Sequence, residues 1–220
     1  MSPRAFERPA TIALAGDRGW ALDGLFVPTA DEPAGGSLIA PPHPLYGGSM
    51  ENPVVTELAH AAERAGIASL RFNWRGVGAS GGEPTGDLDA AAEDYAAGLA
   101  FLAESVDAPL VACGYSFGAI AAARCCAGRT VPEVARVRRL LLVAPPPAGV
   151  TSELLESFSG RILIVAGEHD PIAPPGPLES LARAHERASF VLVEGADHFF
   201  GSGLRALARA VADWLGPRAG

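Results

Sequence analysis

Short apolar segments rich in valine, isoleucine and leucine alternate along this chain with longer alanine-rich segments of helical period. Strands of a parallel sheet read as continuous apolar runs because helices cover both of their faces. The alternation therefore predicts an α/β protein with a mostly parallel sheet. The 220 residues, 49% of them hydrophobic, are enough for one sizeable core. We expect a single domain over residues 1–220, with residues 1–10 flexible.

The segments can be assigned one by one, giving eight strands and about six helices. Strands are predicted at residues 11–16, 20–28, 37–41, 69–74, 109–115, 139–145, 161–167 and 190–195, the first two as an antiparallel pair at one edge. Helices are predicted at residues 53–65, 88–104, 117–127, 152–157, 178–186 and 204–215. Gly66 is expected to end the first helix, and Asp87 to cap the second.

Composition excludes several functions. The net charge of −8 without a basic stripe argues against nucleic acid as a partner. All 17 basic residues are arginine, so the chain has no lysine for a P-loop or a Schiff base. No segment approaches the roughly 18 apolar residues of a membrane span, and the N-terminal residues lack the apolar run of a secretory signal. We expect a soluble cytoplasmic protein with no membrane partner.

The cysteines lack the spacing of a zinc site or of a disulfide framework. They are Cys113, Cys125 and Cys126, all within predicted apolar elements. Buried thiols in a reducing compartment are the expected state. We predict neither a metal nor a cofactor.

Residues 75–82, RGVGASGG, match both the dinucleotide-binding pattern GxGxxG and the nucleophile pattern GxSxG. Each pattern needs a helix that begins directly at the motif. Here GGEPTG follows Ser80 and delays any helix, so we interpret these glycines as turn formers. By contrast, Ser116 in GYSFG has an apolar strand before it and a helical segment directly after it. Ser116 is therefore the candidate nucleophile.

A serine nucleophile of this kind needs a histidine base and an acid, in the chain order serine, acid, histidine. His198, in GADHFF after the last predicted strand, is the histidine in the right place. Asp170, in GEHDP after strand 161–167, is the preferred acid, with Glu168 as the alternative. Asp197 is adjacent to His198, and neighbouring side chains rarely face each other, so it is expected to be a loop carboxylate or turn former.

The motifs together resemble the α/β-hydrolase superfamily, in particular its short lidless bacterial members, which include dienelactone-hydrolase-like and serine-aminopeptidase-like esterases. The resemblance spans nearly the whole chain and rests on HPLYGGSMEN, RFNWRGVGASGG, GYSFG, GEHDPIAPP and GADHFF in this order. It implies an α/β-hydrolase fold with an eight-stranded sheet and helices on both faces, in which RGVGASGG is a structural loop.

The resemblance also implies an oxyanion hole made of two backbone N–H groups. One comes from Phe117, the residue after the nucleophile, and the other from the loop after the third strand. Relatives usually have His-Gly-x there, whereas this chain has a proline, which has no N–H, after His43. We therefore expect the second donor to be Leu45, with Tyr46 as the alternative.

Other residues near these motifs have expected roles. His43 is expected to brace its loop, and Arg75 to make a salt bridge or carbonyl contact rather than bind a substrate carboxylate. Tyr46, Tyr115 and Phe199 are candidates for lining an apolar substrate pocket.

Lidded relatives place a cap domain between the predicted strands 139–145 and 161–167, and this chain has only about fifteen residues there. An open, shallow site favours small or short-chain acyl esters, so a carboxylesterase with a small-molecule acyl substrate is the expected function. The same three residues would also serve a thioesterase, a peptidase or an acyltransferase. A binding or scaffold protein on the same fold is an alternative of another class. The sequence leaves the natural substrate and the oligomeric state open.

Overall fold

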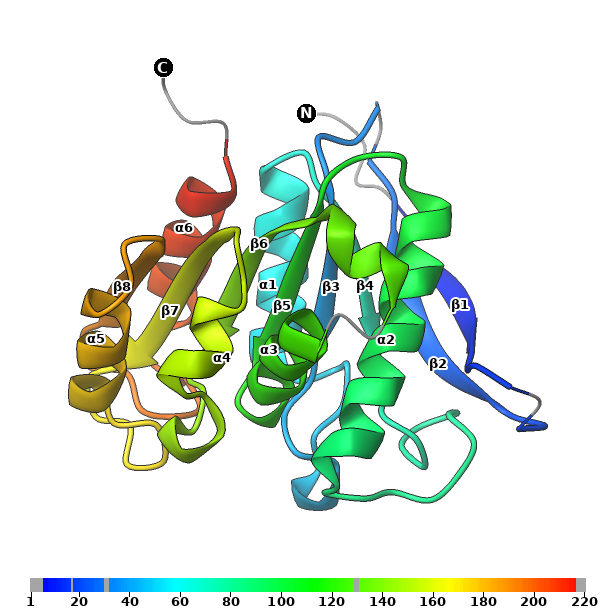
Figure 1. The fold of residues 1–220 in the computed structure, drawn as a ribbon, viewed down its shortest axis with the longest axis horizontal. Coiled ribbons are helices and arrows are strands. Elements are labelled where there is room, and N and C mark those ends of the chain that lie inside the picture. Colours follow the sequence, from blue (N-terminus) through cyan, green and yellow to red (C-terminus); the bar gives the residue numbers. More distant parts are fainter. Residues whose placement is uncertain (1–5, 17, 30–31, 129–130, 217–220) are drawn as a thin grey trace.

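The computed structural model describes residues 6–16, 18–29, 32–128 and 131–216. Its centre is one eight-stranded sheet in the order β1-β2-β4-β3-β5-β6-β7-β8 (Figure 1). β1 is antiparallel to β2, and β2 is antiparallel to β4, whereas all the other neighbours are parallel. The strands are β1 (Arg8–Ala13), β2 (Ala21–Val27), β3 (Gly36–Ala40), β4 (Ala68–Phe72), β5 (Leu110–Tyr115), β6 (Val137–Val143), β7 (Arg161–Gly167) and β8 (Ala188–Val193).

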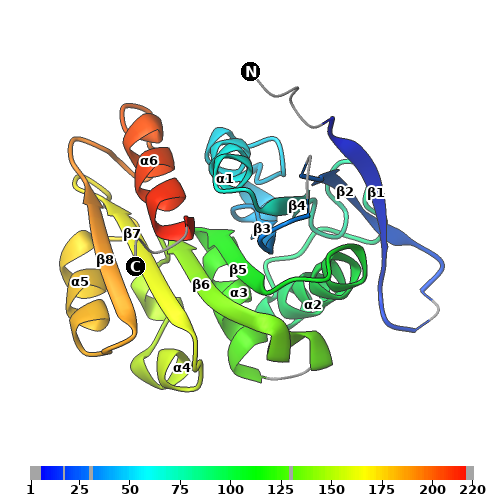
Figure 2. The same ribbon diagram turned by 90° about the horizontal axis from the view of Figure 1, so that it is seen from above.

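Helices cover both faces of the sheet. They are α1 (Pro53–Arg64), α2 (Leu88–Ser105), α3 (Phe117–Gly128), α4 (Ser152–Glu156), α5 (Pro175–Arg183) and α6 (Leu204–Leu215). α1 and α6 pack together on one face, and α2, α3, α4 and α5 lie on the other (Figure 2). This arrangement confirms the predicted α/β fold. Between β6 and β7 the chain forms only a short 3-10 turn (Pro147–Gly149) and α4, so no cap domain is inserted there.

The observed elements agree with the sequence-based assignment except at some ends. β7 and α6 have the predicted bounds, and Asp87 caps α2 by accepting a hydrogen bond from the Ala90 N–H at 2.7 Å. β1 begins at Arg8, earlier than predicted, because its pairing with β2 continues from Ala13 back to Arg8. Residues 8–10, within the stretch expected to be flexible, thus form part of a strand, while residues 1–5 lie outside the described residues.

The core lies between the sheet and its two helical layers. β3, β4 and β5 are buried along their whole length, as continuous apolar strands require. All three cysteines are buried free thiols, and burial raises the pKa of each of them, that of Cys125 to about 12. Protonated thiols of this kind are poor nucleophiles. Among the described residues, no helix combines the length and apolar character needed to cross a membrane.

Candidate active site

Ser116 lies at the sharp turn between β5 and α3. Its φ of 54° is in the left-handed region that non-glycine residues rarely adopt, as expected for a nucleophile elbow. A Cβ at Gly114 would lie 2.1 Å from the Gly118 carbonyl oxygen, and a Cβ at Gly118 would lie 2.5 Å from the carbonyl oxygens of Ala40 and Pro41. The turn therefore requires glycine at both positions, and it holds Ser116 over the N-terminus of α3.

The structure brings Ser116, His198 and Asp170 together, each from the loop at the carboxyl end of a different parallel strand. The His198 Nε2 atom lies 3.0 Å from the Ser116 Oγ atom. The His198 Nδ1 atom lies 2.7 Å from the Asp170 Oδ2 atom. All three residues are buried, with Ser116 retaining the largest exposed fraction, 8%. The distances match a nucleophile, a general base and an orienting acid.

The environment of Asp170 keeps its side chain ionised. Burial alone would raise the pKa of this carboxyl group, but hydrogen bonds from His198, Ala173 and Ile172 and the charge of His198 lower it below its ordinary value. The Oδ1 atom accepts the N–H groups of Ile172 at 2.8 Å and Ala173 at 2.7 Å. An ionised Asp170 accepts from His198 Nδ1–H, which leaves Nε2 free to accept the proton of Ser116.

Tyr115 lies in the core under the histidine loop, not in a substrate pocket as the sequence suggested. It is 1% exposed, and its hydroxyl donates to the backbone carbonyl of His198 at 2.8 Å. Tyr115 does not line a pocket as expected because it is the last residue of β5, a strand in which every residue is buried. Burial raises the pKa of Tyr115, so the hydroxyl remains a proton donor.

His43 braces the loop after β3, as expected. It caps a short 3-10 turn (Pro44–Tyr46), and its Nδ1 atom accepts the Leu45 N–H at 3.2 Å. The His43 carbonyl accepts the Tyr46 N–H at 3.1 Å. Burial lowers the pKa of His43, in keeping with a neutral ring that accepts through Nδ1. The N–H of Leu45, expected as the second oxyanion donor, and that of its alternative Tyr46 are therefore both engaged within the turn.

The backbone N–H groups of His43 and Phe117 differ from those of Leu45 and Tyr46, because they are not engaged in a turn. In the ranges that the structure describes, neither the His43 N–H nor the Phe117 N–H donates a hydrogen bond to another group of the protein. Phe117 is the first residue of α3, where N–H groups have no partner within the helix. The chain just before His43 runs against α3, because the carbonyl oxygens of Ala40 and Pro41 approach Gly118 closely.

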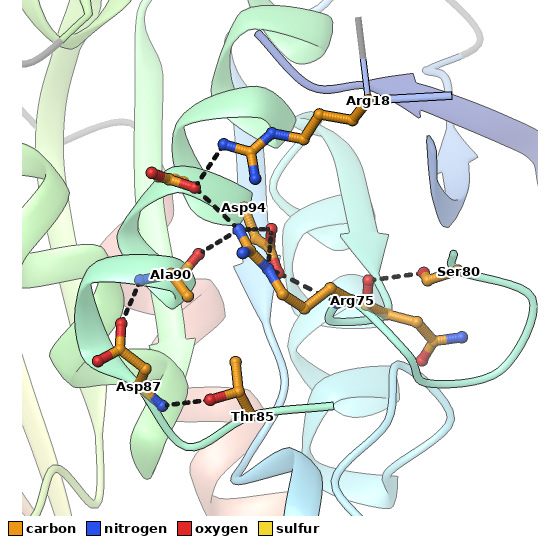
Figure 3. A network of polar contacts seen from close by, with 9 residues as sticks. Arg18, Arg75, Ser80, Thr85, Asp87, Ala90 and Asp94 are labelled. Atoms are coloured by element: carbon orange, nitrogen blue, oxygen red, sulfur yellow. Dashed lines mark hydrogen bonds and ion pairs between the residues drawn. The ribbon is translucent and has the colours of Figure 1, made fainter. Parts of the chain in front are cut away.

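Arg75 is held by acidic groups of α2, as the sequence indicated. Its guanidinium contacts Asp94 at 2.7 Å, Glu93 at 3.1 Å and the Ala90 carbonyl at 2.9 Å (Figure 3). Burial opposes its charge, but the hydrogen bonds and charges of Asp94 and Glu93 raise the pKa of Arg75. Arg18 shares Glu93 at 3.0 Å. Because its guanidinium is occupied by these groups, Arg75 is not available to bind a substrate carboxylate.

Ser80 fixes the glycine-rich loop. Its hydroxyl donates to the Asn73 carbonyl at 2.9 Å (Figure 3). It also accepts the Asp23 N–H at 2.8 Å. Gly76 and Gly78 have φ values of 69° and 61°, which a residue with a side chain rarely adopts. The motif RGVGASGG is a structural turn, as predicted.

The other carboxylates near His198 bind backbone groups. Asp197 accepts the N–H groups of Phe199 at 3.1 Å and Gly201 at 3.4 Å, the turn-forming role expected of it. Glu168, the alternative acid, instead accepts the Gly195 N–H at 2.7 Å. In the described part of the chain, no group of three or more histidine, cysteine, aspartate or glutamate residues is arranged to hold a metal ion.

Large apolar side chains are exposed on the loops that follow β3, β7 and β8. Tyr46 and Phe199, two of the predicted pocket residues, are 87% and 67% exposed, and Leu45 is 56% exposed. Ile172, which was not among the predicted pocket residues, is 50% exposed. The sequence could have indicated this residue, because Ile172 follows Asp170 by two positions in the same loop.

Comparisons with known proteins agree with this geometry. A family model described as an alpha/beta hydrolase domain matches residues 46–207. An alpha-beta serine hydrolase homologue from Coxiella burnetii is 28% identical, with 95% of this chain and 97% of that chain covered and a TM-score of 0.81. A serine hydrolase without a lid from Xanthomonas campestris is 27% identical, with coverages of 96% and 95% and a TM-score of 0.76.

A curated relative, an uncharacterized protein of Rickettsia prowazekii, is 28% identical over 207 residues, which are 88% of this chain and 84% of that protein. The family model alone spans well over half of the chain, including Ser116, Asp170 and His198. The chain belongs to the α/β hydrolase family.

Proposed function

We propose that this protein is a serine hydrolase that cleaves carboxylic esters by two-step acyl transfer. The observation that carries the proposal is the continuous contact from Ser116 through His198 to Asp170. His198 accepts the Ser116 proton as Oγ attacks the ester carbonyl, and it then protonates the departing alcohol. Water, activated in the same way, releases the acyl group and regenerates Ser116. Asp170 holds the imidazole and stabilises its charge.

The oxyanion in this mechanism is bound by two backbone N–H groups, those of Phe117 and His43. The assignment to His43 replaces the expected Leu45, because the Leu45 N–H already donates to the His43 ring. The Tyr46 N–H is engaged in the same turn. Two donors preorganised toward the developing charge are the usual requirement of acyl transfer.

The preferred substrates are esters with a small or short acyl group. The short connection between β6 and β7 contains no cap domain, and a site without a cap does not enclose a long chain. Hydrolysis of 4-nitrophenyl esters of two to twelve acyl carbons tests this point. A marked preference for the longest esters would contradict it.

The decisive experiment is labelling with a fluorophosphonate, which reacts with an activated serine. Ser116→Ala is compared with Ser80→Ala, because both serines lie in a GxSxG pattern and both are 8% exposed. We expect wild type and Ser80→Ala to be labelled at Ser116, located by mass spectrometry, and Ser116→Ala not to be labelled. Folded wild-type protein that takes no label and hydrolyses no ester would refute the proposed function.

A further inference from the structure

Four of the six large apolar side chains that are exposed among the described residues lie in the loops that follow β3, β7 and β8. Leu45 and Tyr46 follow the loop brace His43, Ile172 follows Asp170, and Phe199 follows His198. We call the set formed by Leu45, Tyr46, Ile172 and Phe199 the apolar rim. Each member is at least half exposed. Exposed apolar groups that gather in one place on a soluble protein mark a surface that another apolar group covers.

The two aromatic members are held in place by other rings. The Tyr46 ring lies 4.7 Å from the His43 ring, measured between centroids, and the His43 ring lies 4.6 Å from the Phe117 ring. The Phe199 ring lies 5.7 Å from the His198 ring in an edge-on arrangement. Both exposed rings are therefore anchored to residues that directly adjoin the reacting groups. Rings anchored in this way lose little freedom when another ring packs on them.

The charge of the rim loops is wrong for an anionic ligand. Residues 41–48, 168–174 and 196–200 contain no arginine, and the chain has no lysine. Besides Asp170, these loops carry Glu168 and Asp197, both acidic. Arg75, the arginine considered for a substrate carboxylate, is paired with Asp94 and Glu93. The loops also contain His43, His169 and His198. A carboxylate placed on the rim would meet acidic groups, and no arginine or lysine of these loops.

We propose that the apolar rim binds an uncharged aromatic group of the substrate, so that the enzyme selects neutral aryl esters and rejects esters whose ring carries a carboxylate. The proposal rests on the proposed ester hydrolysis and adds its substrate class. The ring lies against Tyr46 and Phe199, while the ester carbonyl faces Ser116. Recognition is by apolar contact and by the absence of a cation.

Phenyl acetate and 4-acetoxybenzoate are the test pair. The added carboxylate makes the phenol no worse as a leaving group, so a preference for phenyl acetate reports binding. We expect kcat/KM to be at least about tenfold higher for phenyl acetate at low ionic strength, with the ratio falling as salt screens the acidic loops. A ratio near one, or in favour of the carboxylate, would overturn the proposal.

Variants locate the effect on the rim. Tyr46→Ser and Phe199→Ser are each expected to raise KM for phenyl acetate about threefold to tenfold, the range of one aromatic contact. The matched control is Phe6→Ser, because Phe6 is also an exposed aromatic residue, at 86%. Phe6 precedes β1, and the first residues of β1 pair with the end of β2. This places Phe6 at the edge of the sheet opposite the carboxyl ends of the parallel strands. The KM of Phe6→Ser should be that of wild type.

The outcomes separate the two proposals. If Ser116 is labelled and phenyl acetate is hydrolysed, but the rim variants behave like Phe6→Ser, the rim proposal is wrong and the hydrolase stands. If neither labelling nor hydrolysis occurs, the proposed function fails, and the rim proposal fails with it.

Discussion

Replacing Tyr115 by phenylalanine removes one buried hydroxyl and tests whether the core positions His198. The hydroxyl donates to the His198 carbonyl at 2.8 Å, and the side chain is 1% exposed. Without this donor the buried carbonyl has no replacement partner, a loss of about 1–3 kcal/mol in the free energy of unfolding. For a chain of this size, that loss corresponds to about 2–4 °C in Tm for each kcal/mol.

The effect on catalysis should be separate from the effect on stability. The Tyr115 hydroxyl fixes the main chain that carries His198, so its loss lets the imidazole leave its position between Ser116 and Asp170. We expect kcat to fall about tenfold, equivalent to about 1.4 kcal/mol, with KM unchanged because Tyr115 lies beneath the site and does not contact substrate.

Tyr95→Phe provides the matched control. The Tyr95 hydroxyl is also fully buried and is bonded to β5, accepting the Cys113 N–H at 2.9 Å, but it has no contact with the histidine loop. The assays are urea unfolding and steady-state hydrolysis of a short-chain ester. Both variants should lose stability, and only Tyr115→Phe should lose kcat. If Tyr115→Phe is destabilised but keeps the wild-type kcat, Tyr115 has no positioning role.

Two further predictions concern charged groups. Arg75→Met leaves the Asp94 carboxylate, which is 1% exposed, without its guanidinium partner, although the backbone N–H of residue 75 still donates to it at 3.0 Å. Urea unfolding should show a loss of about 3–5 kcal/mol that Arg75→Met/Asp94→Leu largely restores, and a loss below about 1 kcal/mol would contradict the ion pair. The pKa of Asp170 is lower in the folded protein than in the unfolded chain, where it is about 3.9. The ionised side chain therefore stabilises the fold at pH values above the unfolded pKa. This contribution is lost as the pH falls through the lower pKa of the folded protein. The stability advantage of wild type over Asp170→Asn should therefore shrink from pH 6 to pH 3, and an advantage that does not change over this range would refute the assignment.

The sequence predicted the fold and the groups of the candidate site because these depend on strong local patterns. The apolar runs of β5 and β7 are unambiguous, and Ser116 stands where a strand changes directly into a helix. The ends of β1 and α5 were less predictable. Cross-strand pairing extends β1 to Arg8, and prolines that look like loop residues form the first turn of α5, where the missing N–H of a proline has no cost.

The details of the site depended on contacts that no local pattern encodes. Tyr115 and Tyr46 both stand next to motif residues, yet one is 1% exposed and the other 87%. The N–H of Leu45, the expected oxyanion donor, donates to the His43 ring, a contact that the sequence does not specify. The one indication in the sequence was that a histidine directly before a proline can cap a turn. Which way each side chain points is decided by packing across the whole fold.

The elbow and the apolar rim differ in how freely they can change. A side chain at Gly114 or Gly118 would collide with backbone atoms, so the reacting groups sit on a frame that tolerates almost no substitution. Tyr46 and Phe199, by contrast, are mostly in solvent and stabilise the fold little. A library of variants confined to the rim could therefore search for new substrates without reducing protein yield, and inhibitors that rely on rim contacts would be the first to meet resistance.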